Sequence, residues 1–98
     1  MLEAEFKVHV KQKIKDRFPN LDLDFIDTNP FYFRSVPDLI ILGPNVWAAL
    51  EFKRSEHASH QPNQDYFVSR LNRKGYASFI FPENMEEVLN DLERLFRS

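Results

Sequence analysis

Residues 37–53 read PDLIILGPNVWAALEFK, two apolar runs on either side of a turn. Residues 43–45 are Gly, Pro and Asn, which favour turns, and the runs beside them have the length and apolar character of strands. This pattern predicts an antiparallel β-hairpin that begins at Asp38 and ends at Lys53.

The second strand of this hairpin ends in two charged residues that flank an aromatic one. Successive side chains of a strand point to opposite faces of the sheet. Glu51 and Lys53 are therefore expected on one face, with Phe52 on the other.

The register of the hairpin brings acidic groups together. If Leu42 pairs with Trp47 around residues 43–46, antiparallel pairing places Asp38 opposite Glu51. Two carboxylates at this distance repel one another and require a cation. Hard oxygen ligands favour Mg²⁺ or Mn²⁺.

Two predicted helices also aim a polar residue at the sheet. A step of about 100° per residue places Glu3 near the centre of the apolar stripe of the first helix, and Glu5 away from it. The same step places Gln64 among the apolar residues of the middle helix. The alternative for Glu3 is an acid favoured by the helix dipole, and for Gln64 a cap that it forms together with Asn63.

The remaining elements follow from hydrophobic periodicity. The predicted elements are, in order, a helix over residues 2–18, a strand over 21–25, the hairpin, a helix that ends at Gly75, a strand over 76–81 and a helix that begins with the capping pattern Asn84-x-x-Glu87. This αβββαβα order predicts an α/β fold with a mixed sheet, in which the middle helix carries the chain to one parallel crossover strand.

The composition excludes several classes of protein. The chain has 98 residues, which suffice for a single domain, and no cysteine, which excludes disulfide frameworks, thiolate zinc sites and cysteine nucleophiles. Its formal net charge is -2, so a nucleic acid would have to be bound by local basic patches. No apolar run reaches the roughly 18 residues of a membrane span, and the first residues lack a signal-peptide pattern, so we expect a cytoplasmic protein.

The hairpin motif resembles that of a known family. Pro37-Asp38, twelve intervening residues and Glu51-x-Lys53 resemble the PD-(D/E)XK nuclease motif. With Glu3 in the first helix, Gln64 at the start of the middle helix and the order of elements, the chain is most similar to the VRR-NUC family, the virus-type replication-repair nucleases, in its stand-alone phage or bacterial form. The resemblance covers residues 1–81 and implies one restriction-endonuclease-like domain over residues 1–98.

The resemblance also implies a role for each motif residue. Asp38 and Glu51 would hold a Mg²⁺ or Mn²⁺ ion with the backbone carbonyl of Phe52, and Glu3 would act through a bound water or a second ion. Lys53 would orient the attacking water or stabilise the developing charge.

The resemblance extends to Gln64, while two other positions depart from the family's pattern. The resemblance implies that Gln64 hydrogen-bonds Lys53 or a metal-bound water. Ser35 stands where the family often has Gly, and Arg54-Ser55 where it often has Ala or Gly followed by Pro. These departures leave the metal ligands intact and affect the loop that would face the substrate.

The implied function is hydrolysis of DNA phosphodiester bonds by a metal-dependent endonuclease selective for branched DNA, such as four-way (Holliday) junctions or flaps, in replication, recombination or repair. A phage protein of this kind would work in the host cytoplasm. We also expect a homodimer, formed through the aromatic residues 31–33 or the last helix, because cutting both strands of a two-fold substrate needs two active sites. The competing hypothesis is a catalytically silent module of the same fold that binds DNA or protein.

Other candidate residues have simpler explanations. The pair His57-x-x-His60 lacks a third ligand, which favours a solvated loop over a zinc site. Aromatic residues at 31–33, followed by Arg34, are more typical of a packed strand than of a base-stacking surface. Solvated faces are also the simpler interpretation of Lys7, Lys11 and Lys15 in the first helix and of Asp22, Asp24 and Asp27 in the first strand.

Overall fold

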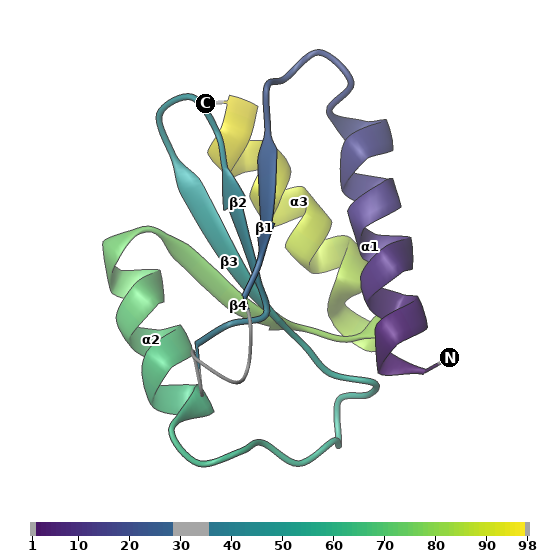
Figure 1. The fold of residues 1–98 in the computed structure, drawn as a ribbon, viewed down its shortest axis with the longest axis vertical. Helices are drawn as coiled ribbons and strands as arrows, with labels where there is room; N and C mark the ends of the chain where they lie inside the picture. Colours follow the sequence, from purple (N-terminus) through teal and green to yellow (C-terminus); the bar gives the residue numbers. More distant parts are fainter. Residues whose placement is uncertain (1, 29–35, 98) are drawn as a thin grey trace.

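The computed structural model describes residues 2–28 and 36–97. Its elements are α1 (Glu3–Arg17), β1 (Asp24–Asp27), β2 (Leu39–Leu42), β3 (Trp47–Phe52), α2 (Gln64–Lys74), β4 (Tyr76–Ile80), a short 3₁₀ helix (Pro82–Asn84) and α3 (Met85–Arg97) (Figure 1). The predicted αβββαβα order is confirmed. No helix among these residues is both long enough and apolar enough to cross a membrane.

The four strands form one mixed sheet in the order β1-β2-β3-β4. The β1–β2 and β2–β3 pairs are antiparallel, and β3 pairs with β4 in parallel. A parallel neighbour requires a crossover connection, and α2 supplies it. The predicted mixed sheet, with its antiparallel hairpin and one parallel strand, is therefore confirmed.

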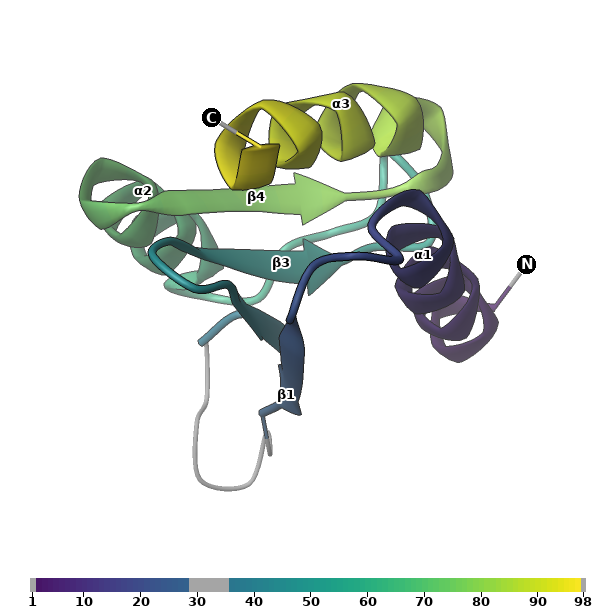
Figure 2. The same ribbon diagram turned by 90° about the horizontal axis from the view of Figure 1, so that it is seen from above.

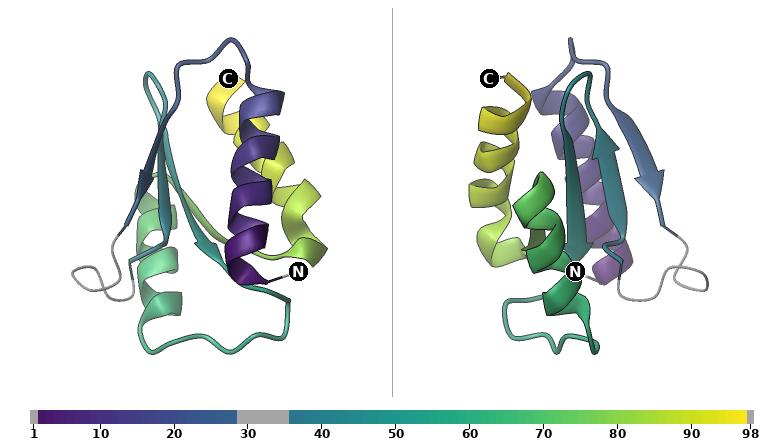
Figure 3. Two further views of the ribbon diagram at one scale, coloured as in Figure 1. Left: turned by 45° about the vertical axis from the view of Figure 1, so that its right-hand side comes forward. Right: turned by 90° about the vertical axis from the view of Figure 1, so that its left-hand side faces the viewer.

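Helices cover both faces of the sheet. The views from above and from the side show α1 and α3 on one face and α2 on the other (Figures 2 and 3). On the α1 and α3 face, the core contains alternate β3 residues, Ala48, Leu50 and Phe52. On the α2 face, a smaller cluster forms around Ala49, with Val68 from α2. The odd-numbered residues of β3, Glu51 among them, therefore belong to the α2 side.

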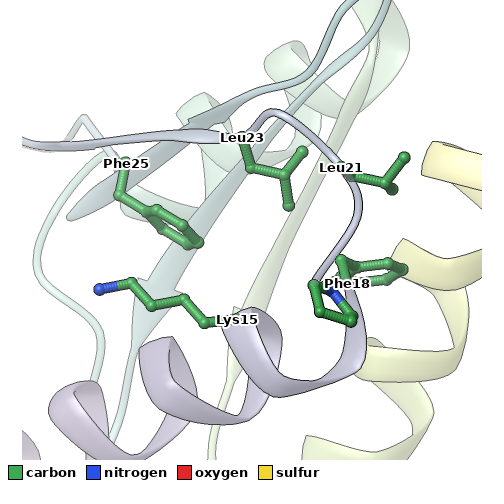
Figure 4. A pocket seen from close by; sticks show the side chains of 6 residues that line it. Lys15, Phe18, Leu21, Leu23 and Phe25 are labelled. Atoms are coloured by element: carbon green, nitrogen blue, oxygen red, sulfur yellow. The ribbon is translucent and has the colours of Figure 1, made fainter.

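The first strand begins later than its alternating sequence predicts. The ladder starts at Asp24, which pairs with Leu42, the last residue of β2, so residues 21–23 have no strand to pair with. Leu21 and Leu23 are apolar because they cover the core at the end of α1. With Phe18, Lys15 and Phe25, they line a hollow of about 240 Å³. Figure 4 shows these side chains around it.

The start of the last helix also differs from its prediction. Asn84 was expected to open a capping box with Glu87, yet its side-chain oxygen accepts a hydrogen bond from the backbone N–H of Phe81 (2.8 Å). Its amide also donates to the carbonyl of Phe79 (3.0 Å). Because Pro82 begins a 3₁₀ turn before α3, Asn84 reaches backward and closes that turn.

Candidate active site

The β2–β3 hairpin places two carboxylates side by side. Leu42 pairs with Trp47 and Leu39 with Leu50, which confirms the predicted register. One step beyond Leu39 and Leu50, Asp38 stands opposite Glu51, and its Oδ2 accepts a hydrogen bond from the backbone N–H of Phe52 (3.1 Å). The side chain of Asp38 therefore lies across the end of β3.

Pro37 determines how the ladder ends at this point. The backbone N–H of Gly43 donates to the carbonyl of Val46. Because hydrogen-bonded pairs recur at every second residue of an antiparallel ladder, Pro37 and Phe52 also occupy a hydrogen-bonded position. A proline has no N–H to donate to the Phe52 carbonyl. Its own carbonyl accepts the hydroxyl of Thr28 (2.8 Å). The Phe52 N–H therefore donates to the Asp38 side chain in place of the ladder. The Phe52 carbonyl receives no hydrogen bond from residue 37.

The two faces of β3 differ as predicted. Phe52 is buried against Phe6 of α1 in an edge-to-face contact, with ring centroids 6.0 Å apart. Glu51 and Lys53 are buried on the other side, where both contact Gln64 of α2. The strand therefore separates one core aromatic from two buried charges.

Gln64 connects these two charges. Its Oε1 accepts from the Lys53 ammonium (2.7 Å) and from the backbone N–H of Gln61 (2.8 Å), and its Nε2 donates to Oε2 of Glu51 (3.0 Å). Asn63, the expected alternative cap, forms no side-chain cap hydrogen bond with α2. The Gln64 side chain therefore fixes the carboxylate and the ammonium relative to one another.

Lys53 is held by groups on three segments. Its backbone N–H donates to Ile80 of β4 (2.9 Å), and its ammonium donates to the carbonyl of Ser59 (3.2 Å) as well as to Gln64. The ammonium is buried, but these acceptors compensate for lost hydration. One of these acceptors, the Ser59 carbonyl, comes from the segment that joins β3 to α2.

Negative charge exceeds positive charge around Glu51. Burial, together with the neighbouring charge and hydrogen bond of Asp38, raises its pKa from 4.5 to about 8, against the opposing effect of Lys53. Glu3, which was expected to face the sheet, is instead exposed in the first turn of α1, ahead of the first buried residue, Phe6; its charge still raises the Glu51 pKa. Such a site is favourable for an added cation.

The donor set fits a hard divalent ion. Within residues 2–28 and 36–97, no three Asp, Glu or His side chains lie close enough together to hold a metal. Asp38 and Glu51 form a pair, and further ligands would come from a backbone carbonyl and water. Mg²⁺ commonly keeps several waters and binds through one or two carboxylates, so a carboxylate pair suits it.

Several candidates lie apart from this site. His60 stacks on Phe79 with ring centroids 4.1 Å apart, and its Nδ1 lies 2.8 Å from Asp65, while His57 is exposed. Asp27 pairs with Lys7 and Lys11, whose hydrogen bonds lower its pKa. The aromatic residues 31–33, Arg34 and Ser35 lie outside the described residues.

Two groups that support the site were not predicted from the sequence. One is the Ser59 carbonyl, which accepts a hydrogen bond from the Lys53 ammonium, and the other is Thr28, which hydrogen-bonds to the backbone of Pro37 and Asp38. Thr28 donates its hydroxyl to Pro37 and its N–H to the Asp38 carbonyl (2.9 Å). A backbone acceptor has no characteristic residue type. Nothing in the sequence pattern could have identified the Ser59 carbonyl.

Comparisons with known proteins give one relevant similarity. No family model matches the sequence, and no curated protein matches it. A solved structure described as "VRR_NUC domain" superposes with a TM-score of 0.60 at 21% identity, over 84% of this chain and 91% of the other. The chain therefore has a VRR-NUC-like fold, as its motif and order of elements predict.

Proposed function

We propose that this chain is a metal-dependent endodeoxyribonuclease that hydrolyses DNA phosphodiester bonds. The observation that carries the proposal is the pair of half-buried Asp38 and buried Glu51, with Lys53 held beside it by Gln64. Two facing carboxylates at the end of the central hairpin do not increase the stability of the fold, so a purely structural role does not explain them. The VRR-NUC-like fold supports the same class of activity.

Asp38 and Glu51 would hold a Mg²⁺ or Mn²⁺ ion together with the Phe52 carbonyl, which residue 37 leaves without a backbone donor. Glu3 would contribute through a bound water or a second ion; its side chain is exposed in the first turn of α1, and its charge acts on Glu51. The bound ion would lower the pKa of a coordinated water and neutralise charge on the phosphoryl oxygens.

Lys53 and Gln64 would contribute to catalysis in different ways. The Lys53 ammonium would orient the attacking water or stabilise the negative charge that develops on the phosphate in the transition state. Gln64 would hold Lys53 and Glu51 at a fixed separation and is a positioning residue.

We further propose selectivity for branched DNA in replication, recombination or repair. The test is incubation with labelled four-way junction, flap, duplex and single-stranded DNA, each with Mg²⁺, Mn²⁺ or EDTA. We expect cleavage of junction or flap DNA with either ion and none with EDTA. DNA binding without cleavage under every condition would instead support a catalytically silent module of the same fold.

The proposal includes a homodimer, which would present two active sites to a two-fold substrate. Three apolar residues of the last helix, Val88, Leu89 and Leu92, are buried in the protein's own core, whereas Leu95 and Phe96 are only half-buried. We expect light scattering at micromolar concentration, with and without junction DNA, to give twice the mass of one chain. A single-chain mass in both samples would contradict the dimer.

A further inference from the structure

Among the described residues, the basic side chains of α2 differ from most of those on α1 and α3 in having no carboxylate partner. Basic side chains of α1 and α3 contact carboxylates, namely Lys7 and Lys11 with Asp27, Arg17 with Glu86 and Glu93, Arg94 with Asp91, and Arg97 with Glu93. In the part of the chain that the structure describes, no carboxylate lies within ion-pair distance of Arg70, Arg73 or Lys74 of α2. Lys13 and Lys15 of α1 also form no ion pair with a described residue, but α2 gathers three such positive charges within five residues of its C-terminal half.

Two of these cations share the outer face of α2 with two hydroxyl groups. A step of about 100° per residue places Tyr66, Ser69, Arg70 and Arg73 within about 50° of one line along the helix. Gln64 and Val68 occupy the opposite, buried side. All four residues of the outer face are exposed, so α2 presents this face to solvent.

The hydroxyls align the guanidinium groups along the helix axis. Arg70 donates to the Tyr66 hydroxyl (3.0 Å), and Arg73 donates to the Ser69 hydroxyl (3.2 Å). Neutral acceptors leave the full charge of each guanidinium and its remaining N–H groups available. A guanidinium of this kind suits the oxygens of a phosphate, which it binds in a bidentate manner.

Along the axis of α2, the outer face begins at Tyr66, two residues after Gln64. Arg70 and Arg73 follow Gln64 by six and nine residues, which amounts to about 9 Å and about 13 Å along the helix at 1.5 Å per residue. Phosphates of one DNA strand advance by about 3.4 Å along the duplex axis, so these lengths span roughly three to four nucleotides.

We propose that Arg70 and Arg73 bind the phosphate backbone of duplex DNA a few nucleotides from the bond that is cleaved. Tyr66 and Ser69 hold the two guanidinium groups in position. This assignment rests on the proposed nuclease function and adds the surface on which the duplex arm of the substrate lies.

The test compares two double variants with the same net charge. R70Q/R73Q removes the proposed contacts, and K13Q/R94Q removes two exposed positive charges from α1 and α3. Binding of a fluorescent duplex and a four-way junction is measured by anisotropy in EDTA, from about 50 mM to about 200 mM salt. Thermal midpoints equal to that of the wild type establish that each variant is folded.

We expect R70Q/R73Q to bind about tenfold more weakly, with a log-affinity against log-salt slope that is shallower by about 1.8, two contacts at about 0.9 each. K13Q/R94Q keeps the wild-type slope, and R70K/R73K recovers most of it. With Mg²⁺, R70Q/R73Q needs more substrate to reach half-maximal cleavage while its maximal rate is unchanged.

The outcomes separate this assignment from the proposed function. Equal slopes for R70Q/R73Q and K13Q/R94Q, in a protein that cleaves DNA, overturn the phosphate surface and leave the nuclease. A slope reduced only in R70Q/R73Q, in a protein that cleaves nothing, supports the surface and overturns the nuclease. A wild-type protein that neither binds nor cleaves DNA overturns both.

Discussion

Glu51→Ala is expected to abolish cleavage of every DNA substrate and to weaken Mn²⁺ binding in the same protein. The hairpin register brings Glu51 and Asp38 together, so the loss of Glu51 leaves Asp38 without the facing carboxylate that would help to hold the ion. Cleavage assays and Mn²⁺ titrations on one preparation measure both effects.

Lys53→Ala is expected to separate the two effects. The substitution removes a positive charge from beside the ion, so metal affinity should be retained or increase. The cleavage rate should fall by about 10²-fold or more, comparable with the loss of one transition-state contact. Single-turnover rates at saturating Mn²⁺ measure this loss without a contribution from metal affinity.

Phe52→Leu is the control between these two positions. Phe52 packs on Phe6 on the opposite face, so a smaller apolar side chain should cost stability, on the order of 1 kcal/mol, and little activity. Wild-type cleavage by Lys53→Ala would contradict the assigned role of the ammonium. A folded Phe52→Leu protein as inactive as Glu51→Ala would contradict the assigned face of β3.

The metal-free protein is expected to lose stability as the pH rises from about 4.5 to about 8. Glu51 has a pKa of 4.5 when exposed and about 8 in the fold, so the folded state holds the extra proton within this window. Stability falls wherever the folded state binds more protons than the unfolded state. Thermal midpoints in EDTA across this range measure the effect.

Mn²⁺ should reverse this trend, because the ion binds the ionised carboxylate and displaces the proton. We expect the increase in midpoint at saturating Mn²⁺ to be larger at pH 8 than at pH 5. Glu51→Gln keeps the size of the side chain without a titrating proton, so its metal-free stability should change less with pH. An identical pH dependence in wild type and Glu51→Gln, or no midpoint shift with Mn²⁺, would argue against a cation site at Glu51.

The hairpin could be predicted from sequence because its two strands are joined by a short turn. Counting outward from residues 43–46 is enough to pair Asp38 with Glu51, and alternation is enough to separate Phe52 from Lys53. Helical spacing identified Gln64 as a polar residue on a buried face, and the structure buries it. Local geometry governs all of these features.

Features that depend on contacts distant in sequence could not be predicted in the same way. The start of β1 is set by where β2 ends, and Leu23 alternates with its neighbours like a strand residue although no partner faces it. The Lys53 ammonium is held by the carbonyl of Ser59, whose position depends on the path of a polar loop. Glu3 lies in the predicted helix, but the distance of its exposed carboxylate from Glu51 depends on how α1 packs against the sheet.

The length of the hairpin turn constrains how this chain can evolve. Substitutions within residues 43–46 leave the count from Leu42 to Trp47 unchanged, so the paired acids stay opposite one another. An insertion or deletion of one residue that β3 absorbs by shifting its register would turn Glu51 toward the apolar α1 side and Phe52 toward α2. Variation in the composition of this turn is therefore compatible with the site, and variation in its length by a single residue is not.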